Sequence, residues 1–298
     1  MKSKTSWIPV YIILGVVWGC SFIFIKAGLE FLSPVGVAFV RCSLGALTLY
    51  SYARFKRIAL PRNRVALAHI WVVSLLLNVI PGIFYAVAET AVTSILAAII
   101  NAVTPLMTVL AILLINREEK PAFHQLLGLF LGFLGVLTVL GAWAGLGDNP
   151  LWAILILLTA VACYGVTFPY TRRFVMPLQI KSEAIVATQL ICAASTLLPI
   201  YLVSGISITA LPITPVLSMV ALGVFGSGFA YLWNFKIMQL AGSAIASSVT
   251  YLTPLVAVIV GVIFLSEKVT WNEPVGALVV LLGAAIAQER IKLTSRSK

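Results

Sequence analysis

Long apolar runs separated by short polar segments repeat along the whole chain. A helix that crosses a membrane needs about 20 predominantly apolar residues. Ten runs approach or reach this length, at residues 8–26, 34–53, 66–88, 93–115, 125–144, 151–171, 183–203, 214–236, 243–265 and 274–289. The segments between them are too short to hold a soluble domain. The pattern therefore predicts an all-α integral membrane protein with ten transmembrane helices.

The composition supports this interpretation. Hydrophobic residues make up 61% of the chain and charged residues only 10%, and the mean hydropathy is +1.08. Soluble domains do not reach such values. The four cysteines, Cys20, Cys42, Cys163 and Cys192, lie inside the apolar runs at unrelated spacings. They form no metal or redox motif, so we expect packing roles for them, no metal site and no cofactor.

The net charge of +11 is spread over the segments between the apolar runs and not gathered in one basic patch. Lysine and arginine concentrate on the cytoplasmic side of membrane proteins. If the N-terminus is cytoplasmic, the cytoplasmic segments contain 17 of the 20 basic residues. The first run, from Ile8, lacks a small-residue cleavage site and is expected to be a retained helix. We therefore predict a multi-pass protein with both termini in the cytoplasm and no nucleic-acid partner.

The two halves of the chain resemble each other. Residues 94–118 and 243–267 align at a shift of 149 positions, with seven identical pairs: Ser94/Ser243, Ala97/Ala246, Thr104/Thr253, Pro105/Pro254, Leu106/Leu255, Val109/Val258 and Glu118/Glu267. At a shift of 146, Trp18-Gly19 and Phe22 align with Tyr164-Gly165 and Phe168. The expected units are residues 1–146 and 147–298, with five helices each. An odd number of helices inserts the second unit upside down, an arrangement that surrounds a central site in many secondary transporters.

A Thr-Pro pair interrupts one apolar run in each half. Pro105 and Pro254 cannot donate a hydrogen bond to the carbonyl four residues earlier, on Asn101 and Thr250. Within lipid such a carbonyl must find a partner inside the protein or in a water-lined cavity. Paired interruptions in matching halves favour a transport site between them, with the prolines as hinges. The alternative is that the prolines only shape the packing of the helices.

Polar and aromatic side chains predicted near the middle of their spans are candidates for a central cavity. Such side chains usually face the interior of a helix bundle. An aromatic wall with a few amide and hydroxyl groups suits a small zwitterion with a bulky side chain. The candidate substrate-binding residues are Trp18, Phe22, Asn78, Tyr85, Asn101, Tyr164, Ser227, Tyr231, Thr250 and Tyr251. The alternative for each polar residue is a hydrogen bond between neighbouring helices. Gly19 and Gly165 are either further hinges or points of close packing.

Few charged residues fall within or beside the predicted spans. Arg41 lies about a third of the way into the second span from the outer side. We expect its side chain to extend toward the membrane surface; the alternative is that it faces the cavity and binds a carboxylate. Glu89 ends the third span near the outer surface and Glu183 begins the seventh near the inner surface. Because no acid lies at mid-depth, the sequence favours a facilitator over a proton antiporter.

Several of these motifs together resemble a known family. Trp18-Gly19 with Phe22, the basic segment after the second span, and AAIINAVTPL at 97–106 echoed by ASSVTYLTPL at 246–255 are similar to the EamA type of the drug/metabolite transporter superfamily. The chain looks most like the YddG-type amino-acid exporters. The resemblance implies two inverted five-helix halves around a central cavity and export from the bacterial cytoplasm across the inner membrane. The family's Thr-Ser-Ala after the third span reads here as residues 89–94, ETAVTS, and departs from that pattern.

The sequence thus predicts a secondary transporter that exports amino acids, aromatic and other bulky neutral ones, by alternating access and facilitated diffusion. A broad metabolite or drug exporter coupled to protons is the first alternative, and a channel is the second. An enzyme is not expected, because Walker A, HExxH and GxSxG motifs are absent and Asp148 is the only aspartate. The expected partners are a small-molecule substrate and membrane lipid, and the expected assembly is a monomer or a weak dimer.

Overall fold

The computed structural model describes residues 7–115, 123–139, 149–204 and 211–287, and every regular element within them is helical. The first half contains α1 Ile8–Gly28, α2 Pro34–Phe55, α3 Arg64–Ser74, α4 Ile80–Ala88, α5 Ser94–Asn101, α6 Thr104–Ile115 and α7 Phe123–Val139. The second contains α8 Leu151–Tyr170, α9 Ser182–Ser204, α10 Ile213–Ala221, α11 Ala230–Ala241, α12 Ser243–Ser247, α13 Thr253–Leu265 and α14 Asn272–Ala287. π-helical segments at Leu75–Val79, Thr171–Val175 and Leu222–Phe229, and 3-10 segments at Met176–Leu178 and Ser248–Tyr251, continue or join these helices.

Eight continuous helical stretches are long and apolar enough to cross a membrane. They are Ile8–Gly28, Pro34–Phe55, Arg64–Ala88, Ser94–Leu114, Leu151–Leu178, Ser182–Ser204, Ile213–Ala241 and Ile245–Leu265. These correspond to eight of the ten expected spans. The other two, the fifth and the tenth, contain shorter apolar stretches at Phe130–Val139 and Asn272–Gly283. The prediction of a multi-span helical protein is therefore confirmed, with eight stretches of full crossing length among the described residues.

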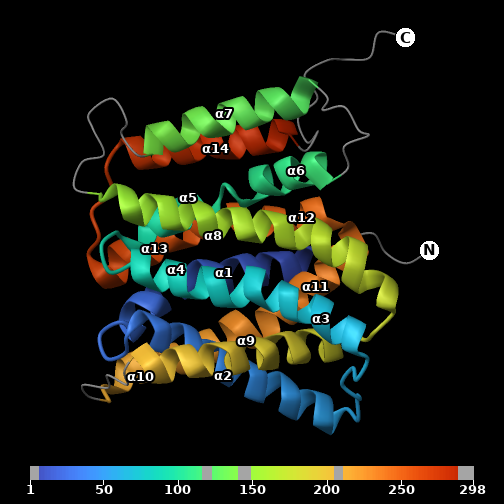
Figure 1. Ribbon diagram of the computed structural model, residues 1–298. Coiled ribbons are helices and arrows are strands. Elements are labelled where there is room, and N and C mark those ends of the chain that lie inside the picture. The colour runs from blue at the N-terminus through green and yellow to red at the C-terminus, as the bar shows by residue number, and fades with distance from the viewer. Residues whose placement is uncertain (1–6, 116–122, 140–148, 205–210, 288–298) are drawn as a thin grey trace, which may run out of the picture.

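The helices lie roughly side by side in layers (Figure 1). α7 and α14 pack along each other at one edge, and α2, α9 and α10 lie at the opposite edge. Between these edges α1 packs against α13, and α6 packs against α8. Many large apolar side chains face outward, for example Phe133, Val203 and Ile263. Exposure of so much apolar surface to water would be unfavourable, whereas its contact with lipid is not.

Both expected helix interruptions are present. α5 ends at Asn101 and α6 begins at Thr104, while α12 gives way to a 3-10 turn before α13 begins at Thr253. The carbonyl that each proline frees is bonded by the threonine just before that proline. Thr104 Oγ1 donates to Asn101 O at 2.7 Å, and Thr253 Oγ1 donates to Thr250 O at 2.8 Å. The Thr-Pro pair therefore breaks the helix and also satisfies the carbonyl that the break exposes.

Two glycines bring pairs of helices into close contact. A Cβ atom on Gly19 of α1 would lie 2.5 Å from Val256 Cβ of α13, and one on Gly165 of α8 would lie 2.6 Å from the carbonyl carbon of Met107. Real Cβ atoms do not approach other atoms so closely. The sequence left two roles open for these glycines, hinges or points of close packing. The geometry directly supports close packing.

Gly165→Ala is therefore expected to lower the free energy of unfolding by about 1–3 kcal/mol, the usual cost of overpacking a tight contact. Thermal unfolding in detergent would measure this. Gly82→Ala is the matched control, because a Cβ there would meet only Ala38 Cβ at 3.5 Å, an ordinary contact. Equal melting temperatures for the two variants, with transport lost only in Gly165→Ala, would instead identify Gly165 as a hinge.

Candidate functional site

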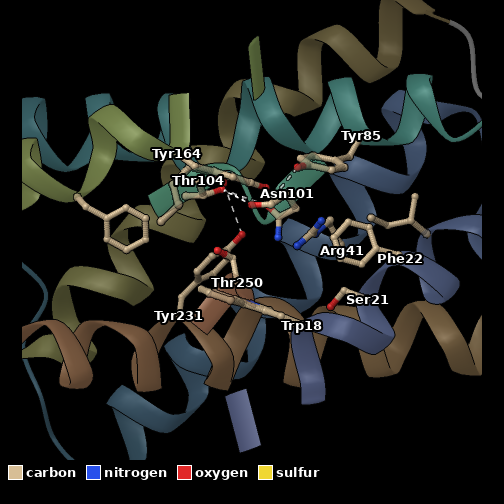
Figure 2. Close-up of a pocket in the computed structure, with 13 residues that line it drawn as sticks. Trp18, Ser21, Phe22, Arg41, Tyr85, Asn101, Thr104, Tyr164, Tyr231 and Thr250 are labelled. Atoms are coloured by element: carbon tan, nitrogen blue, oxygen red, sulfur yellow. Dashed lines mark hydrogen bonds between the residues drawn. The ribbon is translucent and has the colours of Figure 1, made fainter. Parts of the chain in front are cut away.

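A cavity lies among the helices at the level of the two interruptions (Figure 2). It encloses about 540 Å³ of space between protein atoms, open solvent at its mouth included. The thirteen residues that line it come from both halves of the chain: Trp18, Ser21, Phe22, Ile25, Arg41, Leu77, Tyr85, Asn101, Thr104, Tyr164, Phe168, Tyr231 and Thr250.

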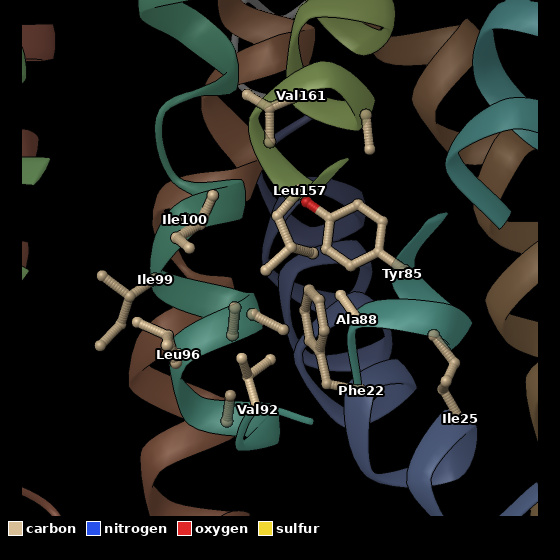
Figure 3. Packing of buried hydrophobic residues seen from close by; sticks show 14 of the residues in the cluster. Phe22, Ile25, Tyr85, Ala88, Val92, Leu96, Ile99, Ile100, Leu157 and Val161 are labelled. Atoms are coloured by element: carbon tan, nitrogen blue, oxygen red, sulfur yellow. The ribbon is translucent and has the colours of Figure 1, made fainter. Parts of the chain in front are cut away.

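Two buried apolar clusters meet at this cavity. The first includes Phe22, Ile25 and Tyr85 together with Val161, and Figure 3 shows Phe22 and Tyr85 beside Leu157 of α8. The second includes Phe168 and Tyr231, with the partly buried Trp18 and Leu77 packed against it. Residues of both clusters therefore line the cavity.

Aromatic rings form much of the wall. Trp18 and Tyr231 meet edge to face with ring centroids 6.0 Å apart, and Phe22 and Tyr85 do so at 5.7 Å. Tyr85 and Tyr164 are stacked at 5.9 Å. Trp18 Nε1 donates to the carbonyl of Gly226 at 3.2 Å, which fixes its indole ring. Such contacts make a stiff apolar wall with ring faces available to a ligand.

Asn101 connects three helices beside the cavity. Its Oδ1 accepts a hydrogen bond from Tyr85 OH of α4 at 3.1 Å, and its Nδ2 donates a long bond to Thr253 Oγ1 of α13 at 3.5 Å. Thr253 Oγ1 in turn bonds the carbonyl of Thr250. The two helix interruptions, which are 149 positions apart in the sequence, are therefore joined through one asparagine. Asn101 lines the cavity and also holds helices together.

Seven of the ten predicted substrate-binding residues line the cavity: Trp18, Phe22, Tyr85, Asn101, Tyr164, Tyr231 and Thr250. The other three lie elsewhere. Asn78 is buried and accepts from Gln189 Nε2 at 2.7 Å, so its described hydrogen bond joins two helices. Ser227 is buried behind the wall and accepts from Arg41. Tyr251 packs against the first apolar cluster.

Six lining residues were not predicted: Ser21, Ile25, Arg41, Leu77, Thr104 and Phe168. Helical spacing was a signal for three of them. Ser21 and Ile25 follow Trp18 by three and seven positions, and Phe168 follows Tyr164 by four, so each shares a helix face with a residue already chosen. Thr104 belongs to the repeated Thr-Pro pair. No comparable signal marks Leu77.

The expected position of Arg41 is wrong. Its side chain does not extend to the membrane surface; it is 7% exposed and lines the cavity. Arg41 Nε donates to Ser227 Oγ at 3.1 Å. Two glycines make this possible, because a Cβ on Gly223 would lie 2.4 Å from Leu44 Cβ and one on Gly45 would lie 3.1 Å from Gly223 O. α2 and the π-helical segment are therefore so close that the arginine turns inward between them.

Glu89 is more deeply buried than its place at the end of the third span suggests. It has no exposed surface, and within the described part of the chain neither carboxyl oxygen has a hydrogen-bond partner. Lys26 Nζ donates to the main-chain carbonyls of Glu89 at 2.7 Å and Val92 at 3.2 Å, leaving the carboxyl group without this bond. Glu89 lies one residue beyond the span that ends at Ala88. Burial raises the pKa of its carboxyl group well above the usual value, and the positive charge of Lys26 opposes this shift.

Metal chemistry has no support among the residues that the structure describes, because no three histidine, cysteine or acidic side chains gather there. The chemistry of the cavity is therefore that of its aromatic rings, hydroxyl groups, one amide and one guanidinium group.

Comparisons with known proteins agree with this geometry. The EamA-like transporter family matches residues 5–141 and, a second time, residues 151–287. The uncharacterized inner membrane transporter YedA of Escherichia coli (strain K12) is 27% identical over 249 residues, which cover 83% of this chain and 79% of the relative. An uncharacterized transporter of Archaeoglobus fulgidus is 28% identical over 301 residues, covering 95% of this chain and 96% of the relative. A crystal structure with 17% sequence identity has a TM-score of 0.70 and covers 97% of this chain and 98% of its own, a likeness of fold.

Proposed function

Because the chain belongs to the EamA-like transporter family, we propose that it is a secondary transporter that exports amino acids, aromatic and other bulky neutral ones, from the bacterial cytoplasm. The observation that carries this proposal is the central cavity. Its wall is largely aromatic and its polar groups are few, which is typical of small-molecule sites. Ring faces such as those of Trp18 and Tyr164 can stack on a bulky side chain.

The proposed mechanism is alternating access between two inverted halves, residues 1–146 and 147–298. Contacts between the halves support it. The first helix of the first half packs against α13, and the first helix of the second half, α8, packs against α6. Each of these pairs joins the first expected span of one half to the fourth span of the other, as a two-fold arrangement requires. The interruptions at Pro105 and Pro254 are then the positions where the halves bend.

The proposed orientation has both termini in the cytoplasm. The start of α1 and the α2–α3 connection at residues 56–63 lie at the same end of the helices (Figure 1). That connection and its flanks contain Arg54, Lys56, Arg57, Arg62 and Arg64. A cluster of basic residues at one end of a bundle favours the cytoplasmic side for that end.

A second candidate mechanism, proton-coupled export, is favoured by Glu89. A buried carboxyl group without a partner is the kind of group that carries protons through transporters. However, Glu89 is not among the described residues that line the cavity. Facilitated diffusion therefore remains the proposed mechanism, and substitution of Glu89 tests it.

Labelled phenylalanine in proteoliposomes is expected to move down its own gradient in both directions and to saturate. An imposed pH gradient should not drive accumulation above equilibrium, because none of the described residues that line the cavity is an acid or a histidine. Glu89→Gln, which has the shape of a protonated carboxyl group, should transport like the wild type. The measurement is uptake and counterflow with and without a pH gradient.

Three results would contradict parts of the proposal. Accumulation driven by protons in the wild type and lost in Glu89→Gln would replace facilitated diffusion with proton coupling. Flux that rises linearly with substrate concentration would indicate a channel. Absence of phenylalanine flux, with saturable flux of another metabolite, would exclude the amino-acid assignment and leave the transporter family unchanged.

A further inference from the structure

We infer that Arg41 binds the carboxylate group of the transported molecule, and that the cavity accepts small apolar carboxylates whether or not they also carry an ammonium group. The inference rests on the proposed transport function and names the chemical group that the site recognises. It extends the substrate class from amino acids to related monocarboxylates without an amino group. It excludes the cationic amines that many drug exporters would accept.

The position of the guanidinium group is the first argument. Arg41 is held by one described hydrogen bond, from Nε to Ser227 Oγ at 3.1 Å. An arginine has five N–H donors, so the terminal nitrogens have donors left for a ligand. In Figure 2 the guanidinium group points into the cavity toward Asn101, beside Phe22. The main-chain contact of α2 with the π-helical segment at Gly223 keeps the side chain there.

The charge balance is the second argument. None of the thirteen described residues that line the cavity is acidic, and Arg41 is the only basic one among them. An arginine charge in a largely apolar interior is costly without a counter-ion. A carboxylate supplies that counter-ion, and the planar guanidinium fork matches its two oxygens. The binding of a carboxylate therefore gives the guanidinium group an ion pair within the cavity.

The same balance disfavours a positive charge on the ligand. An ammonium group would find no carboxylate in the described wall of the cavity, only ring faces and neutral oxygens. Arg41 repels it at short range. In an amino acid this repulsion is offset by the neighbouring carboxylate, but an amine alone has no such compensation. The carboxylate is therefore the required group and the ammonium group is tolerated.

Four ligands of one shape separate these requirements: phenylalanine, 3-phenylpropionate, phenylalaninamide and phenethylamine. Binding to the purified protein in detergent can be followed by the thermal shift and by tryptophan fluorescence. Comparison with the Trp18→Phe variant shows which part of the fluorescence change comes from Trp18. Phenylalanine and 3-phenylpropionate should both bind, and each should block uptake of the other into proteoliposomes. The amide and the amine should bind about tenfold more weakly or worse.

Arg41→Gln and Arg41→Lys test the residue itself. Arg41→Gln should weaken binding of both carboxylates about tenfold or more and leave the weak binding of phenethylamine unchanged or improved. Its melting temperature should stay near or above that of the wild type, because it removes a buried charge and keeps an N–H donor within the side chain. Arg41→Lys keeps the charge and should retain part of the affinity. Arg54→Gln is the matched control, since Arg54 is exposed near the end of the same helix, and it should bind like the wild type.

The outcomes distinguish this inference from the proposed function. If 3-phenylpropionate binds and is transported while phenylalanine is not, amino-acid export is wrong and the carboxylate site stands. If phenylalanine and its amide bind equally well, or Arg41→Gln binds both carboxylates with wild-type affinity, the inference is overturned while amino-acid export stands. Failure of both carboxylates to bind at millimolar concentrations likewise overturns it.

Discussion

Replacing Pro105 or Pro254 by alanine is expected to lower transport about tenfold or more, which corresponds to an activation barrier higher by ~1.4 kcal/mol. Thermal stability should stay near that of the wild type or rise. Alanine restores the N–H donor that proline lacks, and both prolines lie in the first turn of their helices, α6 and α13, where proline itself costs little. The restored donor would compete with Thr104 Oγ1 for the carbonyl of Asn101, or with Thr253 Oγ1 for that of Thr250.

The expected loss of transport follows from what lies at these interruptions. Asn101 and Thr250 both line the cavity, and Asn101 Nδ2 reaches Thr253 of the other half. A continuous helix would change the positions of these groups and remove the two places where a span can bend without losing main-chain hydrogen bonds. Flux of labelled substrate and the melting temperature should be measured for each variant.

Pro199→Ala is the matched control for both prolines. Pro199 also lies inside a helix, α9, but it is exposed on the outer face of the bundle and remote from the cavity. Its replacement should leave transport unchanged. If Pro105→Ala and Pro254→Ala both transport at the wild-type rate, the interruptions serve packing only, and the moving parts must be sought around Trp18 and Tyr164.

These interruptions were predictable from the sequence because proline acts locally. A missing N–H frees one known carbonyl wherever the helix lies, and the same Thr-Pro pair occurs in both halves. The identity of the groups that bond those carbonyls was not predicted, although the threonines stood in the repeated motif. Hydropathy likewise placed the spans, because the requirement for about 20 apolar residues is a property of each segment alone.

The position of the Arg41 side chain could not be predicted from the local sequence. A long cationic side chain within a span often extends to the membrane surface, and this is what the sequence led us to expect. Its inward direction depends on Gly45, Gly223 and Ser227, and Ser227 is 186 positions away in the sequence. The close approach of α2 to a π-helical segment is a tertiary contact that no periodicity indicates. The hydrogen bond from Gln189 to Asn78 is a second tertiary contact of this kind, because Gln189 comes from the other half.

The aromatic residues of the cavity were predictable only in part from the sequence. Trp18 with Phe22 and Tyr164 with Phe168 have the same spacing in the two halves, and all four line the cavity. Internal repetition was therefore a signal for residues that face a common site, because structurally equivalent positions in two related units face the shared interface. Phe168 had this signal but was not among the predicted residues. Ser21 and Ile25 lie on the same face of α1 as Trp18 and were also not predicted, and they break the repeat pattern.

Glu267→Ala is expected to lower the free energy of unfolding by about 1.5–3 kcal/mol, the usual contribution of hydrogen bonds to a charged group. The carboxylate of Glu267 sits on the N-terminus of α5. It accepts from the backbone N–H groups of Ser94 at 2.9 Å and Ile95 at 3.1 Å, and from Ser94 Oγ at 2.8 Å. A helix N-terminus carries a partial positive charge, so a carboxylate there is stabilised by this charge in addition to its hydrogen bonds.

The local backbone directs Glu267 to this position. Ser266, at the C-terminus of α13, has a positive φ of 53°, which turns the chain back so that Glu267 N donates to Gly261 O at 3.2 Å. A Cβ on Gly261 would lie 2.9 Å from Glu267 Oε2, so only glycine leaves room for the carboxylate at this contact. α13 of the second half is thereby tied to α5 of the first half.

The matched control is Glu30→Ala, because Glu30 is an exposed acid that follows α1 at the same end of the helices (Figure 1); it should unfold like the wild type. The free energy of unfolding of Glu267→Gln should lie between those of Glu267→Ala and the wild type. Its amide oxygen can accept one of the backbone hydrogen bonds but carries no charge. Unfolding by heat and by denaturant in detergent gives the comparison. If Glu267→Ala unfolds like Glu30→Ala, the carboxylate adds nothing to the contact between the halves. If instead its stability falls as expected and its transport rate rises, the contact is one that must open during each transport cycle, because weakening a contact that breaks before the rate-limiting step lowers the barrier.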